Sequence, residues 1–381
     1  MSARIILYLS YLGGLGGGES SLLSNLDALD RAEFQPRVIC GTPGAFVDEL
    51  RARGIAAEVM PFRLPHFRGI APVASFDFFP RLNAYLNAFA PSLIHCNDPE
   101  SAYYVAPLAK LRRIPVVWTC WSWWQAERGW KSVFYEKFLT RIITPTRYLK
   151  KCLTTTNARL EKKISVLPFG VDTHLFSPGA RDETFLREFQ IDASAPLVTL
   201  LARFQSVKGH ENFLNAAPKI LDAFSNARFL FVGDTAFETD DANETRRMTR
   251  ERVLGDARLR AAVIFCGFRR DIPRILRASS LLVCPSDFET YGMANLEAMA
   301  CGIPVISTNV GGPSETIIDG ATGFLVPPRD ADALAARVNQ LLSDSALRAR
   351  MGVHARARVE QAFALRDSVA RLQEIYRALL K

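Results

Sequence analysis

Residues 281–307 read LLVCPSDFETYGMANLEAMACGIPVIS. Four apolar residues, Leu281–Cys284, predict a buried strand, and Gly292 marks the start of a short helix that leads to a second apolar strand. The loop between strand and helix carries Glu289, and the helix carries Glu297. A strand, a glycine turn and a helix in this order are typical of a parallel α/β sheet, in which ligands bind at the carboxyl ends of the strands.

The same alternation of short apolar runs and amphipathic segments fills the rest of the chain. It predicts two doubly wound, Rossmann-like α/β domains of similar size, whose strand carboxyl ends face a common cleft. We expect strands at 4–10, 35–40, 57–61, 93–96, 114–119, 141–144, 165–168, 197–202, 228–232, 263–266, 281–284, 304–307 and 323–326. We expect helices at 18–29, 47–53, 79–89, 101–110, 211–224, 330–342, 345–361 and 366–380, and a surface helix or loop at 236–252.

A linker rich in proline and glycine divides the two halves. Pro168, Gly170, Pro178 and Gly179 interrupt the periodic pattern there. We therefore place one domain at 1–177 and the next at 178–363.

The composition is that of a globular protein with more than one domain. The chain has 381 residues, 49% of them apolar, and a net charge of +8, which favours anionic ligands such as nucleotides or an acidic membrane face. Seven scattered cysteines without a C-x-x-C pair predict a reduced, cytoplasmic protein. The first residues lack a signal-peptide layout, and no apolar run reaches the roughly 18 residues that span a bilayer. Any membrane contact is therefore expected to be peripheral, at the inner face.

Glycines follow the first predicted strand. Residues 13–18 read GGLGGG and precede a helix, so the backbone can approach a ligand there and the helix N-terminus favours an anion. The spacing is not G-x-G-x-x-G, so a nicotinamide cofactor is not indicated. The alternative is a flexible loop without a ligand.

Two cations and two carboxylates form the second group of candidates. Arg203 and Lys208 directly follow the first strand of the second domain, and a guanidinium fork beside a mobile ammonium suits a diphosphate. Backbone amides at residues 292–294 can hold phosphate oxygens. The alternatives are two solvated cations, a solvated Glu297 and a Glu289 that only complements the helix dipole.

In combination, these residues resemble the retaining nucleotide-sugar glycosyltransferases of family 4, which share the two-domain GT-B fold. The resemblance covers nearly the whole chain and is strongest over 197–328. The matching motifs are Arg203…Lys208, Glu289-x7-Glu297 with the following Ala-Met-Ala-Cys-Gly-Ile-Pro-Val, Leu167-Pro-Phe-Gly-Val-Asp172 with Phe176 and Pro178, Phe231-Val-Gly-Asp234, Gly311-Gly312-Pro-Ser-Glu315 and Gly320-Ala-Thr-Gly-Phe-Leu-Val-Pro327.

The resemblance implies a role for each candidate. It places the donor, a nucleotide-diphosphate sugar, on the second domain and the acceptor on the first, with the last helix, about 364–381, packing back on the first domain. It assigns Arg203, Lys208 and Glu289 to catalysis: the two cations neutralise the diphosphate and the carboxylate contacts the hexose. The implied substrate-binding residues are Glu297 at the ribose, Gly292, Met293 and Ala294 through their amides, Gly16 and Gly17 at the β-phosphate, and His95 and Trp121 on the first domain.

The chain departs from the family pattern at one position. Many members carry a histidine two residues after the threonine that corresponds to Thr119, and here Trp121 replaces it. That histidine usually touches the donor sugar, so its loss puts the sugar contact in question. His95 is retained, and a hydrogen-bonded core histidine is the alternative to a substrate contact.

All five tryptophans fall within residues 118–130. Three interpretations stay open for them: a core patch, an acceptor site in which indoles stack on sugars, and contact with a membrane surface. The basic segments 110–113 and 150–163 suit an anionic partner, or are solvated helix faces.

We therefore predict a retaining, metal-independent glycosyltransferase. It would move a hexosyl-type sugar to a hydroxyl of a glycan, a lipid-linked glycan or a small molecule, as in polysaccharide biosynthesis, without a cofactor and without nucleic acid. Asp330-Ala-Asp332 is expected to cap a helix rather than to bind a metal. The alternatives are a nucleotide-sugar epimerase of the same architecture and a nucleotide-sugar-binding protein with weakened catalysis.

Overall fold

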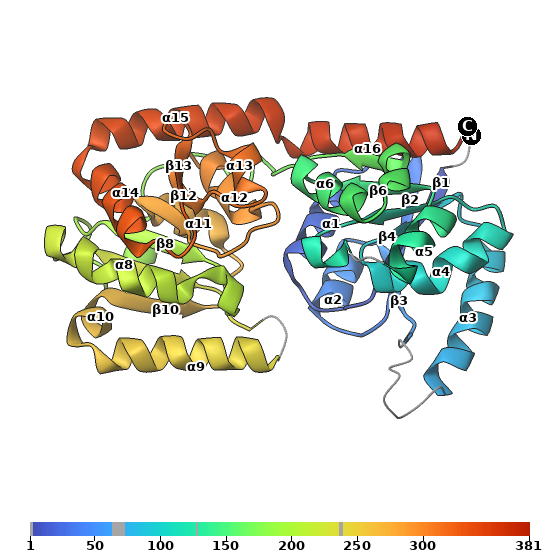
Figure 1. Ribbon diagram of the computed structural model, residues 1–381, viewed down its shortest axis with the longest axis horizontal. Helices are drawn as coiled ribbons and strands as arrows, with labels where there is room; N and C mark the ends of the chain where they lie inside the picture. Colours follow the sequence, from blue (N-terminus) through green and yellow to red (C-terminus); the bar gives the residue numbers. More distant parts are fainter. Residues whose placement is uncertain (1–2, 63–72, 127–128, 236–238) are drawn as a thin grey trace. The chain divides into compact units, whose positions relative to one another are not determined.

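The fold is taken from a computed structural model that describes residues 3–62, 73–126, 129–235 and 239–381. The chain divides into two compact units, Met1–Gly170 with Leu365–Lys381, and Val171–Ala364. The division therefore falls a few residues before the predicted boundary at 177/178. Each unit is a parallel sheet covered by helices, which confirms the predicted pair of doubly wound α/β domains (Figure 1).

The first unit is built on a seven-stranded sheet of order β3-β2-β1-β4-β5-β6-β7. Its inner strand β1 has an unbroken apolar run from Ile6 to Leu9, as expected for a strand that is buried on both faces. The strand order reverses between β1 and β4, so their carboxyl ends flank the switch point of the sheet. The strands are β1 Arg4–Ser10, β2 Phe34–Cys40, β3 Ala56–Val59, β4 Leu93–Cys96, β5 Val116–Thr119, β6 Arg141–Thr144 and β7 Ile164–Val166.

Helices cover both faces of this sheet. Leu7 and Leu9 pack into the core beneath α3, α4 and α5, whereas Tyr8, between them, lies on the opposite face and hydrogen-bonds to Tyr376 of α16. The final helix α16 thus belongs to the first unit. The helices are α1 Gly17–Asp27, α2 Ala45–Ala52, α3 Val73–Phe89, α4 Pro99–Leu111, α5 Trp130–Phe138, α6 Arg147–Thr156 and α16 Leu365–Leu379, with short 3₁₀ turns η1 Trp123–Gln125 and η2 Ala158–Lys163.

The second unit has a six-stranded sheet of order β10-β9-β8-β11-β12-β13. One apolar core lies beneath α8 and α14, and a smaller one beneath α7 and α11. The strands are β8 Leu197–Leu201, β9 Arg228–Val232, β10 Val263–Gly267, β11 Leu281–Cys284, β12 Val305–Thr308 and β13 Gly323–Val326. The helices are α7 Glu183–Glu188, α8 His210–Ala223, α9 Asp240–Gly255, α10 Ala257–Ala262, α11 Ile272–Ala278, α12 Met293–Ala300, α13 Pro313–Thr316, α14 Ala331–Ser343 and α15 Ser345–Ala362, with the 3₁₀ turn η3 Ser206–Lys208.

The predicted elements and the observed ones differ mainly in the helices. The helices α5 and α6 and the short helices α7, α10, α11 and α13 were not expected. In α5 aromatic residues lie on several sides, so its sequence lacks a clear apolar stripe. The polar segment at 236–252 forms α9 from Asp240 onward, while 236–238 lie outside the described residues. Across the described ranges, no helix is both long and apolar enough to cross a membrane.

Candidate donor site

The catalytic candidates gather at the switch point of the second sheet. The strands β8 and β11 are hydrogen-bonded neighbours, and the strand order reverses between them. Arg203 and Lys208 follow β8, and Glu289 follows β11. Because parallel strands end at the same edge, the two loops meet at the position where α/β sheets bind ligands.

Lys208 and Glu289 form an ion pair within this site. Lys208 Nζ donates to Glu289 Oε2 at 2.6 Å, and their side chains are only 20% and 14% exposed. A pair this short and this sheltered is stronger than an ion pair on an open surface. The sequence placed both residues in the site but did not predict that they contact each other.

The loops that carry this pair are held together by backbone contacts. The amide of Asp287 donates to the carbonyl of Val207 at 2.8 Å. Gly209 has a φ of +70°, and a Cβ there would lie 1.9 Å from the carbonyl oxygen of Pro285. Only glycine allows this approach, so the backbone fixes the separation of Lys208 and Glu289.

A second glycine contact braces the other side of the Glu289 loop. The amide of Gly312 donates to the carbonyl of Glu289 at 2.9 Å. Gly311 has a φ of +72°, and a Cβ there would meet the same carbonyl oxygen at 2.2 Å. Arg329 adds a side-chain contact, with Nη2 at 2.6 Å from Asp287 Oδ2. The loop is therefore supported from β8, β12 and β13.

Small polar side chains orient the carboxylate of Glu289. Its Oε2 accepts from Ser286 Oγ at 3.4 Å and lies 3.9 Å from Cys284 Sγ, in addition to Lys208. The chain of polar contacts continues from Cys284, whose carbonyl accepts from Ser307 Oγ at 3.4 Å. Ser286 and Ser307 are not among the predicted site residues; small polar residues at the ends of two buried strands were the available signal.

Helix α12 carries the remaining donor candidates. It begins after Gly292, which has a φ of +85°, so the amides of Met293 and Ala294 lie in its first turn. Glu297 is half-buried on the same helix, and burial raises the pKa of its carboxyl to about 8. Such a carboxyl is largely protonated at neutral pH. This does not fit the alternative interpretation, in which Glu297 is a solvated helix residue.

Two other residues of the β8–α8 connection stand out. Arg203 is half-buried, two residues beyond the end of β8. His210 is 2% exposed and stacks on Phe204 with ring centroids 4.7 Å apart. Within the described ranges neither ring nitrogen of His210 has a hydrogen-bond partner, and burial lowers the pKa of the imidazole to about 4.

The glycine loop of the first unit lies at the start of α1. Gly17 is exposed, and a Cβ there would meet nothing within 4 Å. The amide of Gly16 donates to Glu19 Oε2 at 3.1 Å, so a carboxylate of the chain itself already caps this helix. The predicted approach of Gly16 and Gly17 to a phosphate stays a prediction.

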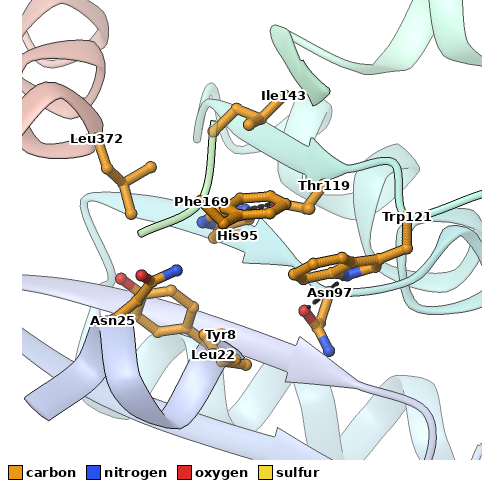
Figure 2. A pocket seen from close by; sticks show the side chains of 10 residues that line it. All are labelled: Tyr8, Leu22, Asn25, His95, Asn97, Thr119, Trp121, Ile143, Phe169 and Leu372. Carbon is orange, nitrogen blue, oxygen red and sulfur yellow. Dashed lines mark hydrogen bonds between the residues drawn. The ribbon is translucent and has the colours of Figure 1, made fainter. Parts of the chain in front are cut away.

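His95 lies in a small cavity of the first unit with room for about one water molecule (Figure 2). Its Nδ1 is 2.5 Å from Tyr376 Oη, and its Nε2 is 2.7 Å from Thr119 Oγ1. Tyr376 Oη also lies 3.0 Å from Tyr8 Oη. Both ring nitrogens are thus occupied, and burial lowers the pKa of His95 to about 3. This geometry favours the alternative interpretation, a core histidine that joins the sheet to α16.

Trp121 lines the same cavity from the end of β5 (Figure 2). Its Nε1 donates to Asn97 Oδ1 at 3.1 Å, and its ring packs on Phe169 with centroids 4.5 Å apart. A Cβ on Gly18 would meet the indole at 3.4 Å, so the ring also lies against the start of α1. The residue that replaces the family histidine is therefore held in place on three sides.

The other tryptophans separate into two groups. Trp118 is fully buried and stacks on Tyr135, with ring centroids 4.6 Å apart, so it belongs to the core. Trp124 and Trp130 are 51% and 64% exposed. The side chain of Trp123 lies outside the described residues. No single interpretation therefore fits all five.

Solved structures share this two-domain architecture. A structure of the Anabaena protein HepE in complex with UDP-glucose superposes with a TM-score of 0.85 at 23% identity, covering 98% of this chain and 99% of the other. A glycosyltransferase from Rickettsia africae superposes with a TM-score of 0.85 at 21% identity over the full length of both chains. At such identities the likeness shows the fold, which is GT-B.

Sequence comparisons match both halves of the chain. "Glycosyl transferases group 1" matches residues 182–358, and "Glycosyltransferase Family 4" matches residues 15–175. An N-acetyl-alpha-D-glucosaminyl L-malate synthase of Bacillus anthracis is 32% identical over 53% of this chain and 50% of its own length. The chain thus spans about half the length of such curated relatives. The chain belongs to the group 1 glycosyltransferases, a family of transferases.

Proposed function

We propose that this protein transfers a hexosyl-type sugar from a nucleotide-diphosphate donor to a hydroxyl acceptor, with retention of configuration and without a metal ion. The observation that carries the proposal is the sheltered Lys208–Glu289 pair, 2.6 Å apart, at the switch point of the second sheet. An ammonium for phosphate and a carboxylate for sugar hydroxyls lie side by side there, next to the first turn of α12.

Each candidate has a task in this proposal. Arg203, Lys208 and the amides at the start of α12 stabilise the negative charge that develops on the departing diphosphate. Glu289 accepts from a hydroxyl of the hexose through Oε1, because Lys208 and Ser286 already hold Oε2. Glu297 binds the ribose hydroxyls. Catalysis then consists of positioning and charge stabilisation.

The proposed transfer needs neither a protein base nor a cofactor. The acceptor hydroxyl attacks the anomeric carbon on the side of the leaving group and passes its proton to the departing phosphate oxygen. The new glycosidic bond forms on the face from which the diphosphate departs, so configuration is retained. Two cations in place of a metal ion make the reaction metal-independent. Asp330, from the single D-x-D sequence, accepts from the amide of Ala333 at 2.8 Å and caps α14, as expected.

Relatives support the donor class and leave the acceptor open. A UDP-Gal:alpha-D-GlcNAc-diphosphoundecaprenol alpha-1,3-galactosyltransferase of Escherichia coli is 25% identical over 95% of this chain and 94% of its own length. By analogy we propose that the donor is a UDP-sugar. The proposed acceptor is a glycan, a lipid-linked glycan or a small molecule that takes part in glycan assembly. Seven free cysteines support a reducing, cytoplasmic compartment.

The test combines donor binding and transfer. A thermal-shift screen of UDP-, ADP- and GDP-sugars should show one donor that raises Tm. With that donor and a panel of acceptors, NMR of the product should show the anomeric configuration of the donor, and EDTA should leave the rate unchanged. Lys208→Met should lower the transfer rate by ~10²-fold or more, and Lys219→Met, an exposed lysine of α8, should not.

The same assay separates the alternatives. Incubation of the donor without an acceptor should leave its sugar unchanged, and an epimerised sugar would instead support an epimerase. Donor binding without transfer to any acceptor would support a nucleotide-sugar-binding protein with weakened catalysis. Full transfer by Lys208→Met would overturn the proposed site.

A further inference from the structure

The positive charge of this chain is concentrated in one segment of the first unit. Residues 110–163 contain 13 Lys or Arg, 3 Glu and no Asp, a net charge of +10. The whole chain has 47 Lys or Arg and 39 Asp or Glu, so the rest holds 34 against 36, a net charge of −2. The overall charge of +8 is therefore a property of this segment.

The elements of this segment pack side by side. Helix α4 contacts α5, α5 contacts η2 and η2 contacts α6. Lys110 Nζ donates to the carbonyl of Lys137, which joins the ends of α4 and α5, and Lys163 Nζ donates to the carbonyl of Leu139 at 2.6 Å. The inner sides of these elements share one apolar core over one face of the sheet. Their outer sides therefore lie next to one another on the outside of the first unit.

Two of the three carboxylates in this segment are neutralised, and the third, Glu127, lies outside the described residues. Glu136 pairs with Arg159 at 3.3 Å, and Glu161 pairs with Lys150 at 2.6 Å. In the described part of the chain, Arg113, Lys137 and Lys162 have no carboxylate partner, and all three are exposed. The excess positive charge faces solvent.

Large apolar side chains lie among these cations. On α5, Trp130 is 64% exposed and Val133 is 43% exposed, and both share the outward stripe of the helix with Lys137. Leu111, at the end of α4 next to Lys110, is 84% exposed. The Trp130 ring leans on Tyr103 of α4, with centroids 5.3 Å apart. We name the residues Lys110, Leu111, Arg113, Trp130, Val133 and Lys137 the α4–α5 face.

The combination of exposed apolar side chains and cations on the α4–α5 face indicates which kind of partner it binds. Arginine and lysine alone would suit any polyanion, but exposed Trp130, Val133 and Leu111 beside them match the interface of a lipid bilayer. Indoles settle there at the level of the headgroups, while cations pair with anionic lipids. We propose that the α4–α5 face binds the surface of a membrane that contains anionic lipids. The inference does not depend on the proposed reaction.

The size of the effect follows from the charges. A lysine or arginine near an anionic surface strengthens binding about fivefold. Loss of three such cations should weaken binding ~100-fold, and screening should remove most of it at about 0.5 M salt. Trp130→Ser should weaken binding about tenfold because the indole is the largest exposed apolar group on the face.

The experiment is co-sedimentation of the full chain with vesicles. Phosphatidylcholine vesicles with about one-third phosphatidylglycerol are compared with pure phosphatidylcholine. The test variant is Lys110→Gln, Arg113→Gln, Lys137→Gln, three exposed cations of the α4–α5 face. The control variant, Arg350→Gln, Arg366→Gln, Arg371→Gln, removes the same charge from exposed arginines of α15 and α16. Leu254→Ser, 63% exposed on α9, is the control for Trp130→Ser. Far-UV circular dichroism and Tm verify folding, and the single variants replace a triple variant that misfolds.

We expect binding to phosphatidylglycerol vesicles alone, a ~100-fold loss for the test variant and little loss for the control variant. Equal losses for both triple variants would show that only net charge matters and would overturn the proposal. So would absence of binding to both vesicles. Single-stranded RNA is tested in parallel. If the chain binds RNA but neither kind of vesicle, and the test variant binds RNA more weakly, the face would be assigned to nucleic acid instead.

Discussion

Glu297→Gln should remove the part of the pH dependence of folding stability that comes from the Glu297 carboxyl. Burial raises the pKa of Glu297 from 4.5 to about 8, so the folded chain holds a proton that the unfolded chain has released between these two values. Folding stability from this group is therefore complete below about pH 4.5 and is lost as pH rises through about 8. Glutamine has nearly the shape of the protonated carboxyl and cannot ionise, so the variant should not show this loss.

The magnitude follows from the shift. About 3.5 pKa units correspond to a ceiling of about 5 kcal/mol. The side chain is half-buried, and water at its exposed atoms reduces the penalty, so we expect roughly 1–3 kcal/mol. For a unit of this size, 1 kcal/mol shifts Tm by roughly 2–4 °C. Glu297→Gln should thus raise Tm by roughly 2–12 °C at pH 9 and leave it nearly unchanged at pH 5.

The assay is calorimetry from pH 4 to 9.5 without donor. Glu374→Gln on α16, where the carboxyl is exposed, is the matched control and should follow the parent chain at every pH. A second readout is donor binding, which should weaken by about 10–100-fold in Glu297→Gln at pH 9, where the parent carboxylate would accept from two hydroxyls. A difference in Tm between parent and variant that is the same at pH 5 and pH 9 would refute the reasoning.

Three further predictions concern single contacts. Ser286→Ala should raise KM for the donor several-fold with little change in Tm, measured by steady-state kinetics, because one of the groups that orient Glu289 is lost. Gly311→Ala should abolish transfer and lower the midpoint of urea unfolding, since its Cβ would lie 2.2 Å from the Glu289 carbonyl oxygen; unchanged unfolding would contradict this. Tyr376→Phe should cost about 1–3 kcal/mol in urea unfolding, because His95 Nδ1 would lose its partner; a loss of transfer at full stability would instead give His95 a functional role.

The sequence predicted the sheets well because a buried parallel strand can be recognised from a short run of apolar residues. Short apolar runs such as Leu281–Cys284 need no information from elsewhere in the chain. It also placed Lys208 and Glu289 in one site, since both follow strands that end at the same edge. It could not predict that they pair, because their contact depends on how closely the two loops approach. That approach is fixed by Gly209 and Gly311, whose φ values no local pattern reveals.

Burial was the second quantity that local patterns could not provide. From the sequence, His95 could be either a substrate contact or a hydrogen-bonded core residue, and Glu297 either a ribose contact or a solvated helix residue. The structure encloses His95 between Tyr376 and Thr119, which are 281 and 24 residues away in the chain. It partly encloses Glu297 on α12, where burial raises the pKa of its carboxyl. Long-range packing thus decides whether a polar residue has a structural or a chemical role.

The two units place different demands on their residues. In the second unit, Gly209 and Gly311 hold the loops of Lys208 and Glu289 in a shape that no larger residue would permit. In the first unit, the fold does not require an indole at Trp130, which is 64% exposed on the outward stripe of α5. An exposed indole among cations contributes little to folding, since most of its area stays in water. Its presence is therefore better explained by a partner than by stability, and the vesicle experiment addresses that explanation independently of the donor site.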